Sequence, residues 1–141
     1  MNKKKALEEL SKYHQEYCNS GFIFHNEFIS DFQVPIKEVQ GHETELFQLL
    51  VKQLTFVKEL GCNVFSADSN EILKYGSCRL YYSLHLQSKN FNIRIIMTFY
   101  ENIPIFLAAF YERAGKKHTD YSVQKDPVIN RFNELFKEDI I

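Results

Sequence analysis

The second half of the chain holds side chains that could together bind and transform an anionic substrate. Arg94 is the only charged residue inside three long apolar runs, and His85 lies in the run before it. Arg113 follows the last run, and His118 and Tyr121 come shortly afterwards. Arginine can hold a phosphate with two parallel hydrogen bonds, and histidine or tyrosine can transfer a proton during a reaction. These five side chains are therefore the candidates for catalysis.

Each candidate also has an interpretation that needs no chemistry. An arginine among apolar neighbours requires a ligand or a partner, so Arg94 could instead form a buried ion pair with Glu112 or Glu71. His85 could be a half-buried strand residue, and Arg113 could belong to a solvated charged turn. The sequence leaves both interpretations open.

Basic residues are concentrated in the same half of the chain. The net charge is −1, yet residues 74–131 contain nine Lys or Arg against four Asp or Glu. Residues 1–73 have the opposite balance, with seven Lys against eleven acidic residues. A basic half could bind a polyanion on one face, unless the asymmetry is accidental. The basic residues expected to contact such a polyanion are Lys74, Arg79, Lys116 and Lys117.

Three apolar runs predict the strands that carry these side chains. Residues 80–86, 93–100 and 103–111 are rich in aromatic and β-branched residues, and short polar breaks separate them. Such runs, joined by breaks that suit hairpin loops, favour an antiparallel meander. If Ile93 and its neighbours at alternate positions face the core, Arg94 faces the opposite side of the sheet.

The remaining apolar residues fall mostly at helical spacing. Residues 4–18 predict a surface helix, and residues 43–60 predict a second helix with a wide apolar stripe. A short strand at 22–25 leads into a third helical stretch, which we expect Pro35 to interrupt. Residues 123–136 predict the last helix, with a proline in its first turn.

The order of these stretches resembles the RelE/HigB/ParE toxin superfamily, most closely its HigB-like and phage-related branch. That family has a strand of the type LYELR, then YRI, then LLHAF-x-KK followed by a helix. The resemblance covers residues 22–136, and Ser83 and His85 replace the charged pair of LYELR. Such toxins are also usually basic, and this chain is not. The matching stretches are YYSLH at 81–85, IRI at 93–95, LAAF at 107–110 and KK at 116–117.

The resemblance implies an α+β fold in a single domain of residues 1–141. An antiparallel sheet of about four strands would carry helices on one face, and residues 1–20 would add an N-terminal helix. Arg94 would bind phosphate, as the arginine of YRI does. His118 and Tyr121 follow the basic turn, where related toxins place an aromatic or histidine side chain that stacks on the substrate or protonates it.

The resemblance further implies the toxin component of a type II toxin–antitoxin system. It would be an endoribonuclease that cleaves messenger RNA without a metal or other cofactor, on the ribosome or away from it. Its partner would be a cognate antitoxin protein. Such cleavage needs a base for the 2′-hydroxyl, cations for the developing phosphorane charge and an acid for the leaving oxygen. Two alternatives share the fold: an inhibitory binding protein like the ParE branch, which targets DNA gyrase, and an inactive phage-related relative.

Other kinds of site have no support in the sequence. The three cysteines fit no metal-binding spacing, and neither a glycine-rich phosphate loop nor a serine nucleophile elbow is present. No apolar run approaches the ~20 residues of a membrane-spanning helix. We therefore expect a cytoplasmic protein that uses no cofactor and no membrane.

If the sheet face and the turn at 113–117 form one cationic patch, RNA binding should weaken steeply as salt rises. Each neutralised phosphate releases counterions, so the logarithm of the binding constant falls linearly with the logarithm of the salt concentration. Fluorescence-anisotropy titrations of a labelled single-stranded RNA would measure this slope. An affinity that stays constant between low and physiological salt would mean that the charge asymmetry is accidental.

Overall fold

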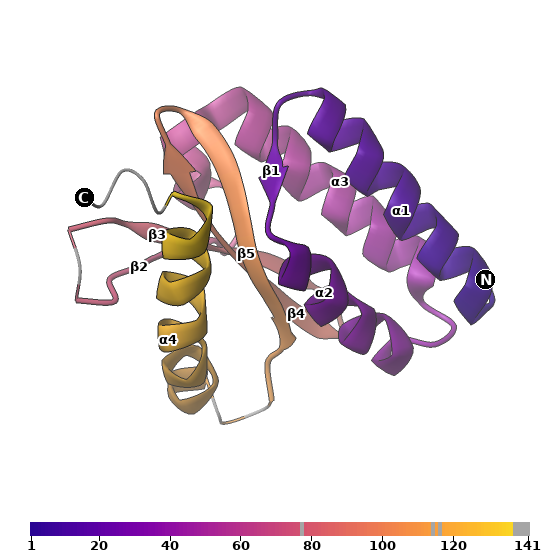
Figure 1. The fold of residues 1–141 in the computed structure, drawn as a ribbon. Helices are drawn as coiled ribbons and strands as arrows, with labels where there is room; N and C mark the ends of the chain where they lie inside the picture. The colour runs from indigo at the N-terminus through magenta and orange to yellow at the C-terminus, as the bar shows by residue number, and fades with distance from the viewer. Residues whose placement is uncertain (77, 114, 116, 137–141) are drawn as a thin grey trace.

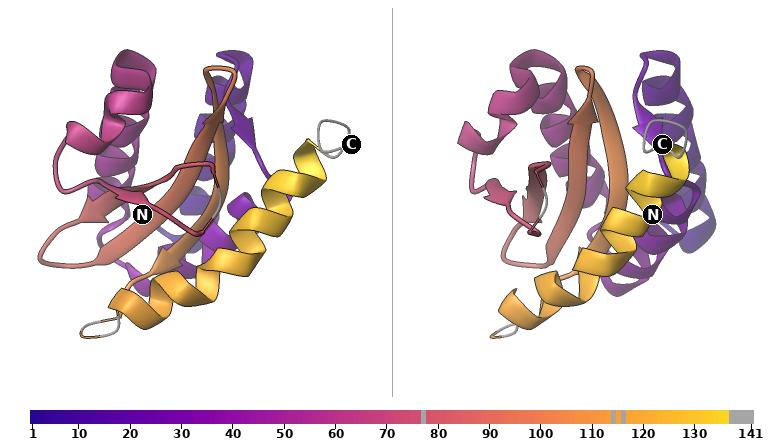
Figure 2. Two further views of the ribbon diagram at one scale, coloured as in Figure 1. Left: turned by 90° about the vertical axis from the view of Figure 1, so that its left-hand side faces the viewer. Right: turned by 60° about the vertical axis from the view of Figure 1, so that its left-hand side comes forward.

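The computed structural model describes residues 1–76, 78–113, 115 and 117–136, with the backbone alone for 117–119. In this part of the chain the fold is α+β, with four α-helices and a five-stranded mixed sheet (Figure 1). Figure 2 shows from two further directions that the sheet lies between helices on both sides. The structure confirms the predicted fold class, and it differs from the prediction in the details of the sheet and its helix layers.

Five strands form the sheet, namely β1 (Ile23–Phe24), β2 (Glu71–Leu73), β3 (Tyr81–Gln87), β4 (Asn92–Tyr100) and β5 (Ile103–Tyr111). Their spatial order is β1-β5-β4-β3-β2. The predicted antiparallel meander is present as β3, β4 and β5. A short strand extends each edge: β2 is antiparallel to β3, and β1 is parallel to β5. The expectation of an antiparallel sheet of about four strands is therefore corrected: the sheet has five strands, and one pair of them is parallel.

Three helices cover one face of the sheet, namely α1 (Lys3–Asn19), α2 (Asn26–Glu38) and α3 (Glu43–Leu60). Buried residues such as Leu10, Phe32 and Leu50 pack there with Leu84 and Ile95 of the strands. The apolar stripe predicted the bounds of α3, and the N-terminal helix extends one residue further at each end than predicted. A 3₁₀ helix, η1 (Gly61–Ser66), leads from α3 towards β2.

The fourth helix, α4 (Lys117–Leu135), packs on the opposite face. Its residues Tyr121, Val128 and Phe132 form a second core with strand residues that include Ile96 and Ile105. The expectation of helices on one face only is therefore wrong. The central strands are apolar at successive positions rather than at alternate ones, so both faces of the sheet bury apolar surface.

Two prolines lie inside helices, although a break at Pro35 and a helix start near Pro127 were predicted. An interior proline removes one backbone hydrogen bond and typically costs about 3 kcal/mol. In α2, Phe32, Pro35 and Ile36 are all buried against the rest of the protein. Apolar burial of this order outweighs the loss of one hydrogen bond, so tertiary packing overrides the local preference.

Candidate functional site

Strand alternation brings Arg94 and His85 together on the face that α4 covers. Ile93 and Ile95 point into the core formed with α1, α2 and α3, as predicted, and Arg94 between them points the other way. His85 of β3 lies directly opposite Arg94 of β4 in the register. Both residues are buried, with 4% of Arg94 and 7% of His85 exposed.

A β-bulge adds Glu112 to this face. The register between β4 and β5 shifts near Met97, and both Leu107 and Ala108 contribute to the core under α4. An extra residue in one strand reverses its side-chain alternation beyond that point. Glu112, just past the end of β5, is therefore directed to the same side of the sheet as Arg94.

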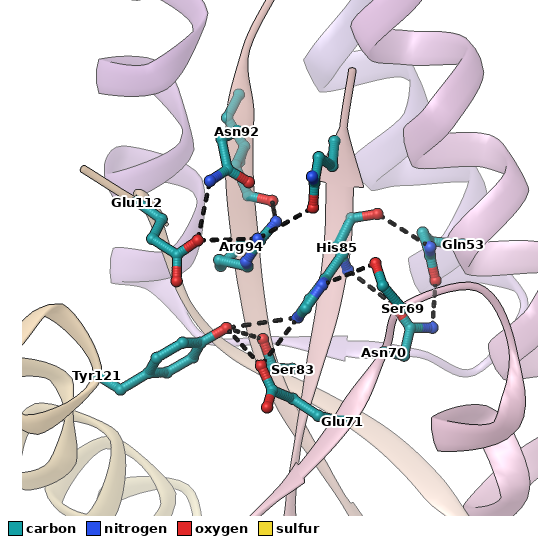
Figure 3. Close-up of polar contacts among 12 residues, drawn as sticks. Gln53, Ser69, Asn70, Glu71, Ser83, His85, Asn92, Arg94, Glu112 and Tyr121 are labelled. Atoms are coloured by element: carbon teal, nitrogen blue, oxygen red, sulfur yellow. Dashed lines mark hydrogen bonds and ion pairs between the residues drawn. The ribbon is translucent and has the colours of Figure 1, made fainter. Parts of the chain in front are cut away.

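Arg94 and Glu112 form a buried ion pair, which is one of the two interpretations that the sequence left open for Arg94 (Figure 3). Nη2 of Arg94 donates to Oε2 of Glu112 at 2.8 Å, and Nδ2 of Asn92 donates to the same oxygen at 2.8 Å. A second acceptor of Nη2 is Oε1 of Gln87 at 3.2 Å. Nε of Arg94 and Oε1 of Glu112 are buried without a hydrogen-bond partner in the described part of the chain. This pair therefore keeps unused hydrogen-bonding capacity.

Hydrogen bonds hold both ring nitrogens of His85. Nδ1 lies 2.9 Å from Oγ of Ser69, and Nε2 lies 3.2 Å from Oε1 of Glu71. An ionised carboxylate can only accept, so we assign the ring proton to Nε2, and Nδ1 then accepts from the Ser69 hydroxyl. The backbone of His85 is also fixed, because its N–H donates to Oδ1 of Asn70 and its carbonyl accepts from Nε2 of Gln53.

The surroundings of His85 keep its imidazole neutral. Its pKa is lowered from 6.5 to about 4, chiefly by burial and secondly by the positive charge of Arg94, while the carboxylate of Glu71 opposes part of this shift. A neutral imidazole at pH 7 has a lone pair on Nδ1 that can accept a proton.

Tyr121 reaches into this region from α4. Its hydroxyl lies 2.5 Å from Oγ of Ser83, 3.4 Å from Oε1 of Glu71 and 3.5 Å from Nε2 of His85. Burial raises the pKa of the Tyr121 hydroxyl above its ordinary value of 10, so the hydroxyl stays protonated at pH 7. We call the following six residues the polar cluster: Glu71, Ser83, His85, Arg94, Glu112 and Tyr121.

Two of the residues predicted to be catalytic are not placed in the polar cluster. Arg113 lies beyond the end of β5, where its backbone N–H and its Nε each donate to Asp120 at 2.9 Å. Its side chain is 61% exposed, and this ion pair ties the beginning of α4 to the end of β5. His118 belongs to the first turn of α4, and its side chain lies outside the described part of the structure.

The sheet face that was expected to form a cationic patch is covered by α4. Lys74 is exposed after β2, whereas Arg79 packs against Phe132, with its guanidinium carbon 4.0 Å from the ring centroid. Lys116 lies outside the described residues, and only the backbone of Lys117 is described. The expectation that this sheet face is exposed and cationic is therefore wrong, because α4 buries the face and Arg94 forms an internal ion pair.

Sequence reasoning missed much of the polar network. It named Glu71 and Glu112 only as partners for a buried arginine, and it gave no role to Ser69, Asn70 or Gln53. Simple alternation from Phe106 along β5 would have directed Glu112 to the wrong face, because the bulge leaves no clear mark in the sequence. Ser69, Asn70 and Gln53 lie on a loop and a helix, so no spacing connects them with His85.

No family model, curated protein or solved structure matches this chain. Among the residues that the structure describes, no helix has both the length and the apolar character needed to cross a membrane. The same residues contain no group of three or more His, Cys, Asp or Glu side chains that could hold a metal ion.

Removing the charge of Glu112 should destabilise the protein strongly. Glu112→Gln keeps the shape of the side chain but leaves the buried Arg94 uncompensated, which typically costs about 3–5 kcal/mol. Urea denaturation would measure the change in the free energy of unfolding. The double variant Arg94→Met/Glu112→Gln should recover much of the lost stability, because no buried charge remains.

The matched control is Lys52→Gln, which breaks an exposed pair and should cost less than about 1 kcal/mol. Equal effects of Glu112→Gln and Lys52→Gln would contradict the burial of the pair.

His85 should make the protein less stable as pH falls from about 6.5 towards 4. In this window an unfolded His85 binds a proton, whereas the folded residue, with its pKa lowered to about 4, stays neutral. The contribution of neutral His85 to the free energy of unfolding is therefore fully present above pH 6.5 and is lost progressively as the pH falls below that value. The free energy of unfolding, measured by urea denaturation at several pH values, should depend less on pH in His85→Gln than in the parent protein. Identical pH dependence in the two proteins would rule out the lowered pKa.

Proposed function

We propose that this protein is a metal-free endoribonuclease that cleaves messenger RNA, acting as the toxin of a type II toxin–antitoxin system in the cytoplasm. The observation that supports this most is the composition of the polar cluster. It combines a neutral histidine, a protonated tyrosine and an arginine on one sheet face. His85 and Tyr121 share one set of hydrogen bonds, and Arg94 lies opposite His85 in a second set with Glu112. These are the three functions that RNA cleavage through the 2′-hydroxyl requires, namely a base, an acid and a cation.

His85 is the proposed base. Its Nδ1 accepts a hydrogen bond from the Ser69 hydroxyl at 2.9 Å, and Ser69 is exposed to solvent. A ribose 2′-hydroxyl that displaced the Ser69 hydroxyl would meet the same lone pair and lose its proton to Nδ1. Glu71 would stabilise the imidazolium that forms, because it accepts from Nε2 on the other side of the ring.

Arg94 is the proposed cation for the phosphorane. Oε2 of Glu112 accepts from both Arg94 and Asn92, so this position already binds an anionic oxygen with two donors. A phosphate oxygen that replaced the carboxylate oxygen would receive the same two hydrogen bonds. Glu112 lies between β5 and α4, so its withdrawal requires movement of that connection and loss of the hydrogen bond from its N–H to the carbonyl of Asn92.

Tyr121 is the proposed acid for the 5′-oxygen that leaves. The attacking 2′-oxygen forms a bond to phosphorus, the bond from phosphorus to the 5′-oxygen breaks, and the Tyr121 hydroxyl supplies the proton. The products are a 2′,3′-cyclic phosphate and a free 5′-hydroxyl. Tyr121 is buried, with only 7% of it exposed, so RNA cannot reach it from the side of α4. RNA would approach from the side of Ser69 and Glu71, where the Glu71 side chain is 31% exposed.

The resemblance stated from the sequence lends further support. The chain runs from a short strand through two helices to a meander and a last helix, which is the order of the stretches that carried the resemblance. The positions of the family's charged LYELR pair hold Ser83 and His85, and both belong to the polar cluster. A cognate antitoxin protein is the partner that this proposal implies.

A non-catalytic inhibitory binding protein is the second candidate, with DNA gyrase as the target implied by the ParE branch. The specific observation that favours it is the burial of Arg94 and His85, whose side chains are 5% and 6% exposed. On this hypothesis the ion pair and the hydrogen bonds of His85 serve only to hold α4 on the sheet, as in an inactive relative.

Incubation of the purified protein with a defined messenger RNA in EDTA tests the proposal. We expect cleavage that leaves 2′,3′-cyclic phosphate ends, and a loss of about 10²-fold or more in rate for His85→Gln and for Tyr121→Phe. The matched control is Lys52→Gln, a change at a residue that is 48% exposed and whose Nζ pairs with Asp68. Melting temperatures of all variants separate a lost reaction from a lost fold. Growth arrest without any RNA cleavage would favour the binding protein, and cleavage abolished by EDTA would exclude the metal-free mechanism.

A further inference from the structure

One edge of the sheet is only partly covered. β5 pairs with β4 along its whole length, but on its other side it pairs with β1 only at Ile105 and Phe106. Figure 1 shows the chain passing from β1 directly into α2 beside β5. The later half of β5 therefore has no strand partner on this side among the residues described.

His25 explains why β1 ends so early. Its N–H donates to the carbonyl of Phe106 at 2.9 Å, which is the last backbone contact of this segment with β5. Its Nδ1 then accepts from the N–H of Glu27 and caps the start of α2. The cap turns the chain into a helix, so the parallel pairing cannot extend past Phe106.

The alternation of hydrogen bonds shows which backbone groups remain free. The N–H of Glu112 donates to the carbonyl of Asn92, so residue 112 points its backbone groups towards β4. In an antiparallel pair the residues in between point theirs away from the partner strand. The N–H and C=O groups of Ala109 and Tyr111 therefore point outward, and within the described chain no strand or side chain bonds them. We call these four groups the β5 edge.

A groove lies along the β5 edge. It has a volume of about 480 Å³ and is lined by Val34, Pro35 and Glu38 of α2 and by Ala109 and Tyr111 of β5, among others. Val34 is 58% exposed and Tyr111 is 36% exposed, so the groove offers apolar surface to solvent. The carboxylate of Glu38 is exposed and forms no ion pair with any described residue.

We propose that the β5 edge binds an extended peptide segment of a partner protein as an added strand. Two residues with free outward groups can pair with a segment of about five residues. An aliphatic side chain of the segment lies against Val34 and Pro35, and a Lys or Arg pairs with Glu38. Strand edges with unpaired backbone groups pair readily with other chains, and natural sheets usually block them with proline or charge. Tyr111 is 36% exposed but Ala109 only 5%, so the peptide reaches Ala109 from within the groove. The inference rests on the geometry of the edge and not on the proposed ribonuclease function.

A blocked peptide of alternating valine and threonine, with one lysine near its amino end, is a suitable probe. Titration into the ¹⁵N-labelled full chain should shift the amide signals of Ala109 and Tyr111. Two N-methylated versions of the peptide provide matched controls, because alternate N–H groups of a strand point in opposite directions. One methylation pattern should lower the affinity at least about tenfold, since it removes two hydrogen bonds, and the other should have little effect. Equal effects of both patterns, or shifts confined to other residues, would overturn the proposal.

Variants of the protein test the same edge from the other side. Tyr111→Pro removes an outward N–H without removing a bond to β4, and Pro104 already occupies an equivalent position of β5. We expect it to lower the affinity about tenfold, and Tyr111→Val, which keeps the N–H, to lower it less. Should Tyr111→Pro fail to fold, the two methylated peptides still decide the question with the parent chain.

The charge of Glu38 provides a third arm. Glu38→Lys should weaken binding of the lysine peptide by about fivefold, and a peptide with glutamate in place of the lysine should recover it. A loss without recovery would remove Glu38 from the site. If sedimentation shows that the chain dimerises through this edge and Tyr111→Pro makes it monomeric, the occupant is a second copy and the peptide proposal is wrong.

Discussion

The buried charge of Arg94 is the constraint on which the rest of this face depends. An arginine that is 4% exposed has to be compensated within the protein, and Glu112 provides the compensation. Glu112 can do so only because the bulge in β5 turns it to the side of Arg94. Its carboxylate also needs donors, and Asn92 and Arg94 both supply them. The buried charge near the beginning of β4 is thus linked to the bulge in β5, to the position of the chain just after β5 and to the polar character of the sheet beneath α4.

The helix α4 covers two different surfaces. Val128 and Phe132 pack on an apolar part of the sheet, whereas Tyr121 contacts the polar cluster near the start of the helix. Arg113 and Asp120 fasten that start to β5, and Arg131 fastens the later half through a hydrogen bond to the carbonyl of Leu107. The polar end of the interface depends on hydrogen-bond geometry, which tolerates displacement less well than apolar contact does. Movement of the connection between β5 and α4 would therefore alter the polar cluster before it altered the apolar core.

The sequence predicts the parts of this fold that depend on local pattern. Runs of apolar residues indicate the meander, alternation around Arg94 indicates its face, and an apolar stripe indicates α3 with its correct ends. Features that depend on tertiary contacts were not predictable in the same way. Parallel pairing of β1 involves two residues, Pro35 of α2 is tolerated because of packing, and the bulge has no sequence mark. The same division applies to the site. Arg94, His85 and Tyr121 were proposed from residue type and from the resemblance. Ser69 becomes a neighbour of His85 only when the loop before β2 folds over β3, and Gln53 only when α3 packs on the sheet.

The ion pair of Arg94 with Glu112 and the hydrogen bonds of His85 fit both a catalytic and a purely structural role. The two roles differ in whether these residues can be replaced by apolar ones without loss. A polar cluster that only holds α4 in place could be exchanged for apolar residues of similar volume without loss, since buried ion pairs seldom stabilise more than good apolar packing. A cluster that carries out proton transfer cannot be exchanged, because its neutral histidine and protonated tyrosine depend on the low polarity around them. Two buried atoms of the pair that have no partner among the described residues, Nε of Arg94 and Oε1 of Glu112, argue against optimisation for stability alone. A network selected only to hold α4 on the sheet would be expected to satisfy these atoms, whereas one that must exchange a carboxylate for a phosphate has to leave them available.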